Sequence, residues 1–298
     1  MGLLEKAIVS ALPLVPRAIM RRISGRYIAG ETLEEAVTCL TDLRARGYSG
    51  VIDLLGEDVH GEPAARRVMQ EYEVIAQAMH THQLDAYVSV KPTHFGLRTS
   101  RDLALELYAE LARSCASRGQ FLRVEMEDHT TTDDTLWIFA ELRRSFANVG
   151  IVLQSRLMRT PDDIRNLPPE SDVRMVKGIY IEPAAIAHTD YVPIRDAFVA
   201  ACEQLWRAGH RIRLATHDEH MAARCLQLAA DLGVARDRYE FEVLLGVQQP
   251  LWERWRARNY GVRVYVPFGP DWRAYSTRRL KKNPAIAGHV LRALLRGR

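Results

Sequence analysis

Short runs of branched and aromatic residues recur along the chain and alternate with longer segments in which apolar residues return every three or four positions. Branched and aromatic side chains are typical of β-strands, so each run predicts one strand. Eight such runs are present: GVIDLL (50–55), AYVSVK (86–91), FLRVEM (121–126), GIVLQS (150–155), VRMVKG (173–178), RIRLAT (211–216), YEFEVLL (239–245) and VRVYVP (262–267).

The segments between these runs have the anatomy of amphipathic helices. In SRDLALELYAELARSCASRG, apolar residues recur at helical spacing between Ser100, a candidate N-cap, and Gly119, a stop signal. The segments ETLEEAVTCLTDLRARG and DEHMAARCLQLAADLG repeat this pattern. The chain is therefore predicted to alternate strands with helices.

This alternation predicts a parallel sheet, since parallel strands need helical crossovers. Eight units favour an α/β fold of the (β/α)₈ TIM-barrel type, which is typically about 250 residues long. A doubly wound sheet is the alternative, but the segment after the first strand, LLGEDVHGEP, lacks the G-x-G-x-x-G fingerprint of dinucleotide-binding versions. We expect one domain over residues 1–298, with residues 1–28 as an N-terminal helical extension.

Composition adds little to this picture. The 298 residues are 47% hydrophobic and 26% charged, with a formal net charge of +4, which is ordinary for a globular protein and gives no reason to expect a nucleic-acid partner. Four scattered cysteines form neither a zinc pattern nor a disulfide framework, which favours a cytoplasmic protein. The N-terminal segment MGLLEKAIVSALPLVPRAIMRR predicts an amphipathic helix that packs on the domain, or else an interfacial anchor, rather than a signal peptide.

Polar residues stand at the ends of the predicted strands, where the active sites of barrel enzymes lie. A set that converges on one mouth indicates a functional site, although any single carboxylate there could instead cap the next helix. The set comprises Asp53, Glu57, Lys91, Glu125, Glu127, Asp128, Gln154, Lys177, Thr216, His217, Asp218, Glu242 and Tyr265.

We expect no metal at this mouth. The acidic residues near Glu125 and His217 could hold a divalent cation, but Lys91 and Lys177 would compete for the same carboxylates. The pair His80-Thr-His82 resembles a metal-binding pair, yet it precedes its strand and so lies at the opposite end of the barrel or on a helix end.

The segment RVYVPFGPDWRAYSTRRLKKNP (263–284) predicts a last strand followed by a helix that lies over the barrel mouth. On a helix that starts near Asp271, one face carries Tyr275, Arg278, Arg279 and Lys282. Paired arginines suit a carboxylate or a phosphate, so the face either grips such an anion or is a solvated basic surface.

The segments VIDLLGE, VSVKPTHFGL, FLRVEMED, GIVLQSRLMRTPDD, RMVKGIYIEP, LATHD, YEFEVLLGV and RVYVPFGPDWRAYSTRR follow one another in order from near residue 29 to the C-terminus. Together they resemble the proline dehydrogenase family of flavoenzymes. The resemblance implies a distorted (β/α)₈ barrel and non-covalent FAD. It also implies hydride transfer from proline to flavin N5, which gives pyrroline-5-carboxylate, and reoxidation by a quinone or a similar acceptor. Peripheral contact with a membrane would then serve the acceptor, and the basic C-terminal segment RALLRGR fits such contact, although a solvated helix end explains it as well.

The resemblance also implies roles for single residues. Arg278 and Arg279 would hold the substrate carboxylate. Other substrate contacts would come from Tyr265, Tyr275 and Leu244, and catalytic roles would fall to Lys91, Glu125 and Arg174. The flavin would be contacted by Met126, Gln154, Arg174, Lys177, Gly178, Ile179, Thr216 and His217. A hydride acceptor gains negative charge, which cations such as Arg174 and Lys177 would stabilise.

Several positions depart from the family pattern. Lys282 stands where the family helix has Glu, and Glu242 stands in place of an amide, which offers a carboxylate to balance Lys282. The other departures are Glu125 for Asp, Ile179 for Ala, and Pro92 and His94 in the VKPTH segment. These changes lie in the implied site and leave the substrate open between proline and another cyclic or secondary amine, including a proline derivative of a biosynthetic pathway.

Alternatives outside this family also remain at this stage. A barrel lyase or aldolase would use Lys91 or Lys177 as a Schiff base. A metal-dependent hydrolase would use Glu125 and His217, and a degenerate barrel would only bind. The retained arginine pair favours a substrate with a free carboxylate.

Overall fold

The computed structural model of the protein describes residues 21, 25–273, 275 and 276. The predicted N-terminal extension over residues 1–28 lies largely outside this range. So do Arg278, Arg279 and Lys282, together with most of the predicted C-terminal helix.

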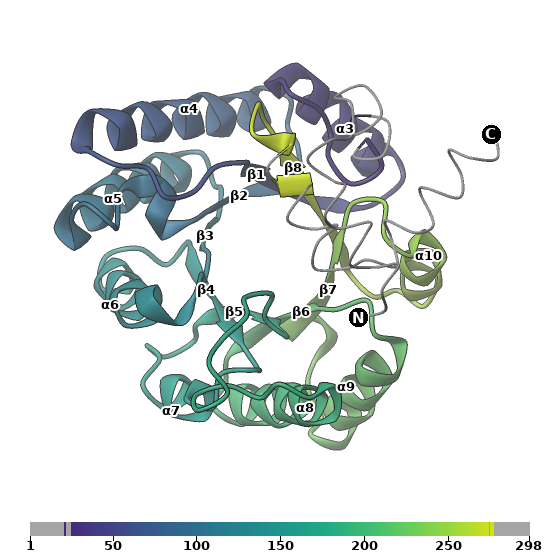
Figure 1. Cartoon of the computed structure of the whole chain (residues 1–298). Helices are drawn as coiled ribbons and strands as arrows, with labels where there is room; N and C mark the ends of the chain where they lie inside the picture. The colour runs from purple at the N-terminus through teal and green to yellow at the C-terminus, as the bar shows by residue number, and fades with distance from the viewer. Residues whose placement is uncertain (1–20, 22–24, 274, 277–298) are drawn as a thin grey trace, which may run out of the picture.

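Eight parallel strands pair in sequence order, and the last pairs with the first, so that they form a closed barrel (Figure 1). The predicted (β/α)₈ fold is therefore confirmed. The strands are β1 (Ser49–Leu54), β2 (Ala86–Val90), β3 (Leu122–Val124), β4 (Val149–Gln154), β5 (Asp172–Val176), β6 (Arg211–Ala215), β7 (Tyr239–Leu244) and β8 (Val262–Phe268). Each begins and ends within three residues of the run that predicted it.

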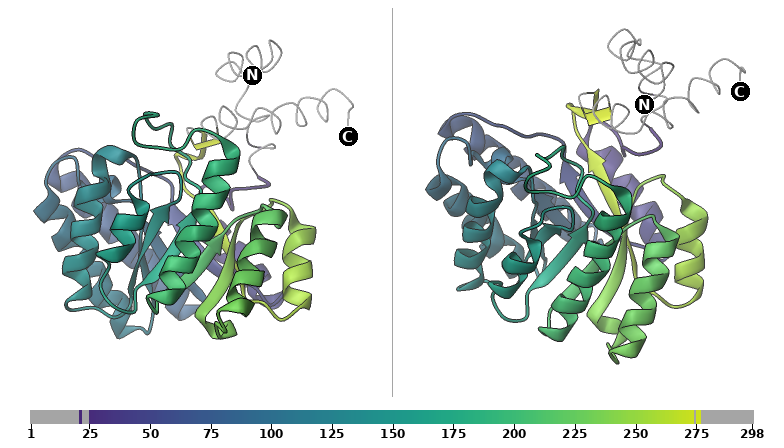
Figure 2. Two further views of the ribbon diagram at one scale, coloured as in Figure 1. Left: turned by 90° about the horizontal axis from the view of Figure 1, so that it is seen from below. Right: turned by 60° about the horizontal axis from the view of Figure 1, so that its bottom comes forward.

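Helices surround the barrel on the outside (Figure 1). They are α3 (Leu33–Ala45), α4 (Glu62–Thr81), α5 (Arg101–Ser117), α6 (Thr132–Arg143), α7 (Thr160–Arg165), α8 (Tyr191–Arg207), α9 (Glu219–Asp231) and α10 (Gln249–Ala257), with short 3₁₀ helices at η2 (Pro92–Phe95), η3 (His129–Thr131) and η4 (Arg236–Arg238). Figure 2 shows the barrel from the side, with the long loop between β5 and α8 rising at the end where the strands finish. None of the described helices is long and apolar enough to cross a membrane.

Local signals fix the ends of these helices as the sequence predicts. The side chain of Thr32 accepts a hydrogen bond from the Glu35 amide, and Glu35 bonds back, which completes a capping box on α3. The Ser100 side chain caps α5 by accepting from the Leu103 amide, and Gly119 follows the end of this helix with a positive φ of 67°. Each cap satisfies amides that a helix start would otherwise leave without a partner.

The two faces of the barrel wall differ in polarity. One set of alternating strand residues, including Val88, Ile151, Leu214 and Val264, is fully buried and belongs to the hydrophobic core between strands and helices. The other set faces the barrel interior and is largely charged or polar. It includes Tyr87, Ser89, Arg123, Asp172, Arg174, Arg213, Glu240, Glu242, Arg263 and Tyr265. Barrel interiors are usually filled by branched apolar side chains, so this polar filling departs from the usual pattern.

The segment over residues 26–30 crosses the carboxyl ends of β7 and β8. The Ala29 amide donates to the Pro267 carbonyl (2.9 Å), and the Gly269 amide donates to the Gly30 carbonyl (3.0 Å). Gly246, which follows β7, has a positive φ of 71°, and a Cβ atom there would lie 1.6 Å from the Arg26 carbonyl oxygen. Only glycine allows this crossing.

We therefore expect Gly246→Ala to destabilise the fold strongly. The matched control is Gly233→Ala, because Gly233 also has a positive φ (64°) but has no atom within 4 Å of an added Cβ. Both variants lose about 1–2 kcal/mol to the left-handed backbone, whereas Gly246→Ala loses at least a further 1–3 kcal/mol to the collision. Urea denaturation of the two variants measures the difference, and equal losses would show that the segment does not cross here.

Candidate active site

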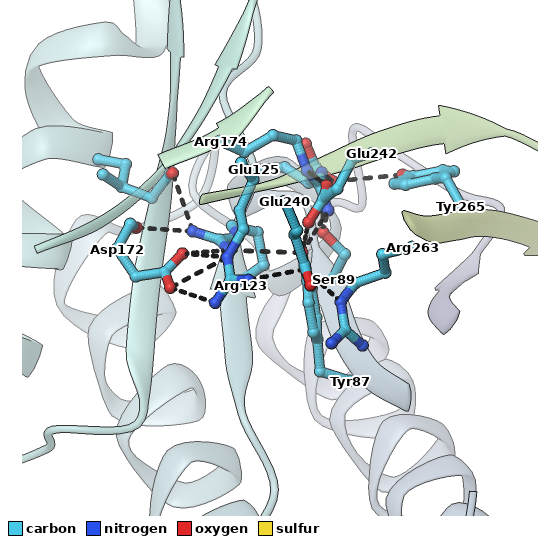
Figure 3. Close-up of polar contacts among 12 residues, drawn as sticks. Tyr87, Ser89, Arg123, Glu125, Asp172, Arg174, Glu240, Glu242, Arg263 and Tyr265 are labelled. Carbon is cyan, nitrogen blue, oxygen red and sulfur yellow. Dashed lines mark hydrogen bonds and ion pairs between the residues drawn. The ribbon is translucent and has the colours of Figure 1, made fainter. Parts of the chain in front are cut away.

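Arg174, on β5, is the centre of a buried polar network inside the barrel (Figure 3). Its Nε donates to the Glu242 carboxylate, and its Nη1 donates to Glu125 at 2.5 Å. Its Nη2 donates to the Tyr87 hydroxyl at 3.2 Å, and Tyr87 in turn donates to Glu242. Every nitrogen of the guanidinium is therefore engaged by a residue on, or directly after, another strand.

Glu125 links this network to the mouth of the barrel. It directly follows β3 and accepts hydrogen bonds from Ser89 and from the Tyr265 hydroxyl, the latter at 3.3 Å. The guanidinium of Arg174 lies over the Tyr265 ring, 5.1 Å from its centroid. The plane of Arg174 is thus held by two carboxylates and two tyrosines, which leaves it little rotational freedom.

Burial and charge act against each other in this network. Burial raises the pKa of Glu242, but the guanidiniums of Arg174 and Arg123 outweigh it, so that the net pKa is lowered and the carboxylate is ionised at neutral pH. Burial likewise lowers the pKa of Arg174, while Glu125 and Glu242 raise it well above its usual range. Removal of one partner from such a buried pair typically costs about 3–5 kcal/mol, because it leaves an uncompensated charge.

A second ionic layer lies deeper in the barrel (Figure 3). Asp172 accepts from Arg123 (2.6 Å) and Arg213 (2.6 Å), and Glu240 pairs with Arg213 (2.8 Å) and Arg263 (2.6 Å). Both guanidiniums Arg123 and Arg263 lie over the Tyr87 ring, 5.3 and 4.9 Å from its centroid. Tyr87 therefore connects the deep layer to the Arg174 network above it.

At the mouth, Asp53 is a buried carboxylate without a hydrogen-bond partner in the described part of the chain. Its residue is 1% exposed, and neither Oδ1 nor Oδ2 has a partner. Burial is the main cause that raises its pKa to about 6, and Glu125 adds to the rise. Lys91, the nearby Tyr265 hydroxyl and Arg174 oppose it. Lys91, at the end of β2, donates to the Gly56 carbonyl (3.1 Å) and lies 3.7 Å from Glu57. Asp53 can therefore exchange a proton near neutral pH beside a held cation.

A polar cradle lies beside this mouth at the ends of β4 and β5. The Gln154 side-chain amide donates to the Glu127 carbonyl (2.7 Å), while its Oε1 is buried and has no partner among the residues that the structure describes. Gly178 has a φ of 99°, and a Cβ there would lie 2.7 Å from that same Oε1. Just beyond it, Ile179 and Ile181 are 62% and 90% exposed. A free acceptor, a close backbone and uncovered apolar side chains suit a flat heteroaromatic group that carries an N–H donor.

Cationic and aromatic groups extend this cradle outward. Asp218 receives hydrogen bonds from Arg195 (2.5 Å) and the Tyr191 hydroxyl (2.7 Å), and Lys177 lies 3.4 Å from the same carboxylate. Thr216 accepts from the Asp218 amide (3.0 Å). Together Lys177 and Arg195 offer positive charge to a phosphate-bearing ligand.

The structure brings most of the predicted site residues to one end of the barrel. Those described there, at or just after strand ends, are Lys91, Glu125, Met126, Gln154, Lys177, Gly178, Ile179, Thr216, His217, Leu244 and Tyr265, with Arg174 just below and Tyr275 after β8. His217 accepts a hydrogen bond from the Leu244 amide at 3.0 Å, which joins two of them directly. Arg278 and Arg279 lie outside the described residues.

The sequence suggested that Glu242 balances the charge of Lys282, but in the structure Glu242 has other partners. Glu242 lies inside the barrel, bonded to Arg174 and Tyr87. His94, another departure from the family pattern, is buried and meets Tyr72 edge-on, with its ring against Gly56. Burial is the main cause that lowers the pKa of His94 to about 3, so its ring is neutral.

Two functional candidates, Tyr87 and Ser89, were not among the predicted residues, whereas Asp53 was predicted at the mouth as a strand-end residue without a role of its own. Tyr87 and Ser89 lie below the strand ends, where only the alternation of residues in AYVSV could have indicated an inward direction. In the described part of the chain, no group of three or more potential ligands is placed to hold a metal ion.

The position of Asp53 predicts a pH-dependent stability. The unfolded chain releases this proton near pH 3.8 and the folded protein near pH 6, so only the folded state binds it between these values. Stability therefore falls as pH rises through this window, by about 3 kcal/mol. We expect Asp53→Asn to raise the free energy of unfolding by about 2–3 kcal/mol at pH 7.5 and much less at pH 4.

Urea denaturation at the two pH values measures this effect. The control is Asp237→Asn, since Asp237 is exposed and should show no such pH dependence. A gain for Asp53→Asn that is the same at both pH values would contradict the assignment.

Comparison with known proteins places this geometry in a family. The family model for proline dehydrogenase matches residues 36–292. The chain is 33% identical over 287 residues to "Proline dehydrogenase" of Deinococcus radiodurans, covering 94% of this chain and 93% of that protein. It is also 33% identical over 272 residues to "Proline dehydrogenase 1" of Bacillus subtilis, covering 91% and 90% of the two chains.

A solved structure has the same fold. The crystal structure of proline utilization A from Bdellovibrio bacteriovorus, inactivated by N-propargylglycine, superposes with a TM-score of 0.81 at 22% identity. The match covers 92% of this chain and 36% of that longer one. The family model and the two relatives of nearly equal length establish the conclusion: the chain belongs to the proline dehydrogenase family.

Proposed function

We propose that the protein is a proline dehydrogenase that oxidises L-proline, or a close analogue, to the pyrroline-5-carboxylate-type imine with non-covalent FAD. The observation that carries this proposal is Arg174, fixed between Glu125 and Glu242 directly below the strand ends that hold the polar cradle. Family membership supports the reaction type. In this account residues 1–298 form one barrel domain with residues 1–28 as its N-terminal helical extension, and the match of one family model to residues 36–292 supports a single domain.

The cradle residues fit the cofactor that the family uses. The unpartnered Oε1 of Gln154 would accept from the ring system, Gly178 leaves room for it, and Ile179 would cover it. Met126, Thr216 and His217 complete the proposed cofactor contacts, and Lys177 supplies positive charge. When bound, FAD supplies the hydride acceptor for the reaction.

The protein residues position the substrate. Arg278 and Arg279 hold its carboxylate through charge-assisted hydrogen bonds, and Leu244, Tyr265 and Tyr275 surround its ring. This places the reacting C–H bond in one orientation, which is worth several kcal/mol of the activation barrier. Arg174, held in its network, places its guanidinium below the proposed cofactor site, and Glu125 and Glu242 offset its positive charge.

The substrate amine must be unprotonated before a hydride can leave from the adjacent carbon. Lys91 and the arginines disfavour an ammonium at the mouth by charge repulsion. Asp53, with a pKa of about 6, holds the released proton at Oδ in acidic solution and is an anion in basic solution. These residues therefore favour turnover above neutral pH.

A quinone or a similar molecule is the proposed electron acceptor, and the protein acts in the cytoplasm with peripheral contact to a membrane. The support for this contact is the exposed apolar surface beside the mouth, where Ile181 and Val192 project from the loop between β5 and α8 and from the first turn of α8.

A second candidate function is the oxidation of another cyclic or secondary amino acid. The observations that favour it are the departures within the site, namely Glu125, Glu242 and the bulky Ile179 beside Gly178. The Schiff-base lyase has no such support, since the family model and the relatives reported above are proline dehydrogenases.

An anaerobic substrate screen tests the proposal. The purified protein, saturated with FAD, should lose its visible flavin absorbance when proline is added. Hydroxyproline and pipecolate test the second candidate, and proline methyl ester, which lacks the carboxylate, should bleach the flavin far more weakly. A protein that binds no FAD, or that none of these compounds bleaches, would contradict the proposal.

The arginine assignment has its own test. Arg278→Ala should weaken the apparent affinity for the responding substrate by roughly 10- to 100-fold, as expected for a lost charge-assisted hydrogen bond. Arg273→Ala is the control, since Arg273 is an exposed arginine in the same segment. If the two variants have the same affinity as the wild type in stopped-flow bleaching, Arg278 does not bind the carboxylate.

A further inference from the structure

Glu242 is the second of two carboxylates that pair with the guanidinium of Arg174. The guanidinium is paired through Nη1 with Glu125, at 2.5 Å, and Glu242 adds a second carboxylate on Nε. Glu242 is 3% exposed and belongs to the middle of the barrel interior (Figure 3). Burial of a second carboxylate is costly, so the arrangement calls for a compensating role.

Other residues hold Glu242 in its ionised form. The Tyr87 hydroxyl donates to its Oε1, and Arg123 donates to the same hydroxyl at 3.4 Å from the deeper layer. The Tyr87 hydroxyl thus donates its proton to the carboxylate and accepts hydrogen bonds from two guanidiniums, since Arg174 also donates to it at 3.2 Å. Arg174 and Tyr87 therefore fix the charge and the position of Glu242 directly, and Arg123 does so through Tyr87.

Two carboxylates on one guanidinium change its net charge. Arg174, Glu125 and Glu242 sum to one negative charge, whereas Arg174 with Glu125 alone would be neutral. Inside a protein the charge of one residue acts over several ångströms, because the surroundings screen it weakly. A group bound at the strand ends above Arg174 would therefore experience a more negative potential than the arginine alone creates.

We propose that Glu242 is a positioning residue that offsets the charge of Arg174 and thereby lowers the reduction potential of a flavin bound at the barrel mouth. This inference rests on the proposed function. A flavin gains negative charge when it is reduced, so a nearby carboxylate disfavours reduction. The consequence is a cofactor that takes electrons from the substrate less readily and passes them to an acceptor more readily than it would above an unopposed arginine.

The chain contains a matched control for this idea. Glu240 precedes Glu242 by two residues on β7, faces the same barrel interior and is ion-paired, but with Arg213 and Arg263 of the deeper layer. Glu240→Gln and Glu242→Gln remove the same charge and the same number of atoms. Only Glu242→Gln removes a carboxylate that contacts Arg174.

The experiment measures the midpoint potential of FAD in the wild-type protein, E242Q, E240Q and E242D by anaerobic spectroelectrochemistry. We expect E242Q to raise the potential by at least about 30 mV, which is a tenfold shift in the two-electron equilibrium. E242D keeps the charge and should restore most of the wild-type value, and E240Q should shift it less than E242Q. A merely structural role would not separate E242Q from E242D in this way.

The outcomes that overturn the inference are distinct from those that overturn the function. If E242Q has the potential of the wild type, or if E240Q shifts it equally, Glu242 does not act through Arg174. If E242Q does not fold, Glu125→Gln removes the other carboxylate on the same guanidinium and must raise the potential in its place. If proline bleaches the flavin but the midpoint potential shifts in neither E242Q nor Glu125→Gln, the proposed function stands and this inference is wrong. If the protein binds no FAD, both are wrong.

Discussion

An arginine buried inside a barrel must be neutralised, and this constraint organises the centre of the protein. Arg174 is 3% exposed, and its three nitrogens are bonded to residues of β2 and β7 and to the residue that follows β3. Each partner is in turn bonded, Glu125 to Ser89 and Tyr265, and Glu242 to Tyr87. Because a half-satisfied network would be worse than an apolar core, the strands that carry these groups are held in one register by the network as well as by their backbone hydrogen bonds.

In the deeper ionic layer, too, each charged side chain is paired with one of opposite charge. Arg123, Arg213 and Arg263 alternate with Asp172 and Glu240, so no charge there lacks an opposite neighbour. The guanidinium of Arg123 lowers the pKa of Asp172 despite the opposing effect of burial, which keeps the pair ionised. This layer lies below the Arg174 network, so that the network lies between it and the mouth of the barrel.

The sequence predicted the barrel well because the fold depends on repeated local signals. Eight strands and the caps at Thr32, Ser100 and Asp218 follow from runs, spacing and cap chemistry that each lie within a few residues. The residues at the mouth were found for a related reason, since strand ends converge in every such barrel.

The interior of the barrel was harder to predict from sequence. Runs such as RIRLA and YEFEV were interpreted through their branched residues, whereas their charged residues alternate and point inward. Nothing local indicates that Glu242 meets Arg174 and Tyr87, because the partners are 68 and 155 residues away in sequence. The burial of the Asp53 carboxylate could not be predicted either, since the absence of a hydrogen-bond partner among the described residues is a property of the folded mouth.

The most direct test of this account is a crystal structure of the protein with FAD and a non-oxidisable carboxylate analogue of proline. The account predicts that Arg174 keeps both carboxylates, that the flavin lies against Gln154 and Gly178, and that Arg278 and Arg279 bind the carboxylate of the analogue. A structure in which the flavin occupies another part of the protein, or in which Arg174 leaves Glu125 and Glu242, would contradict it.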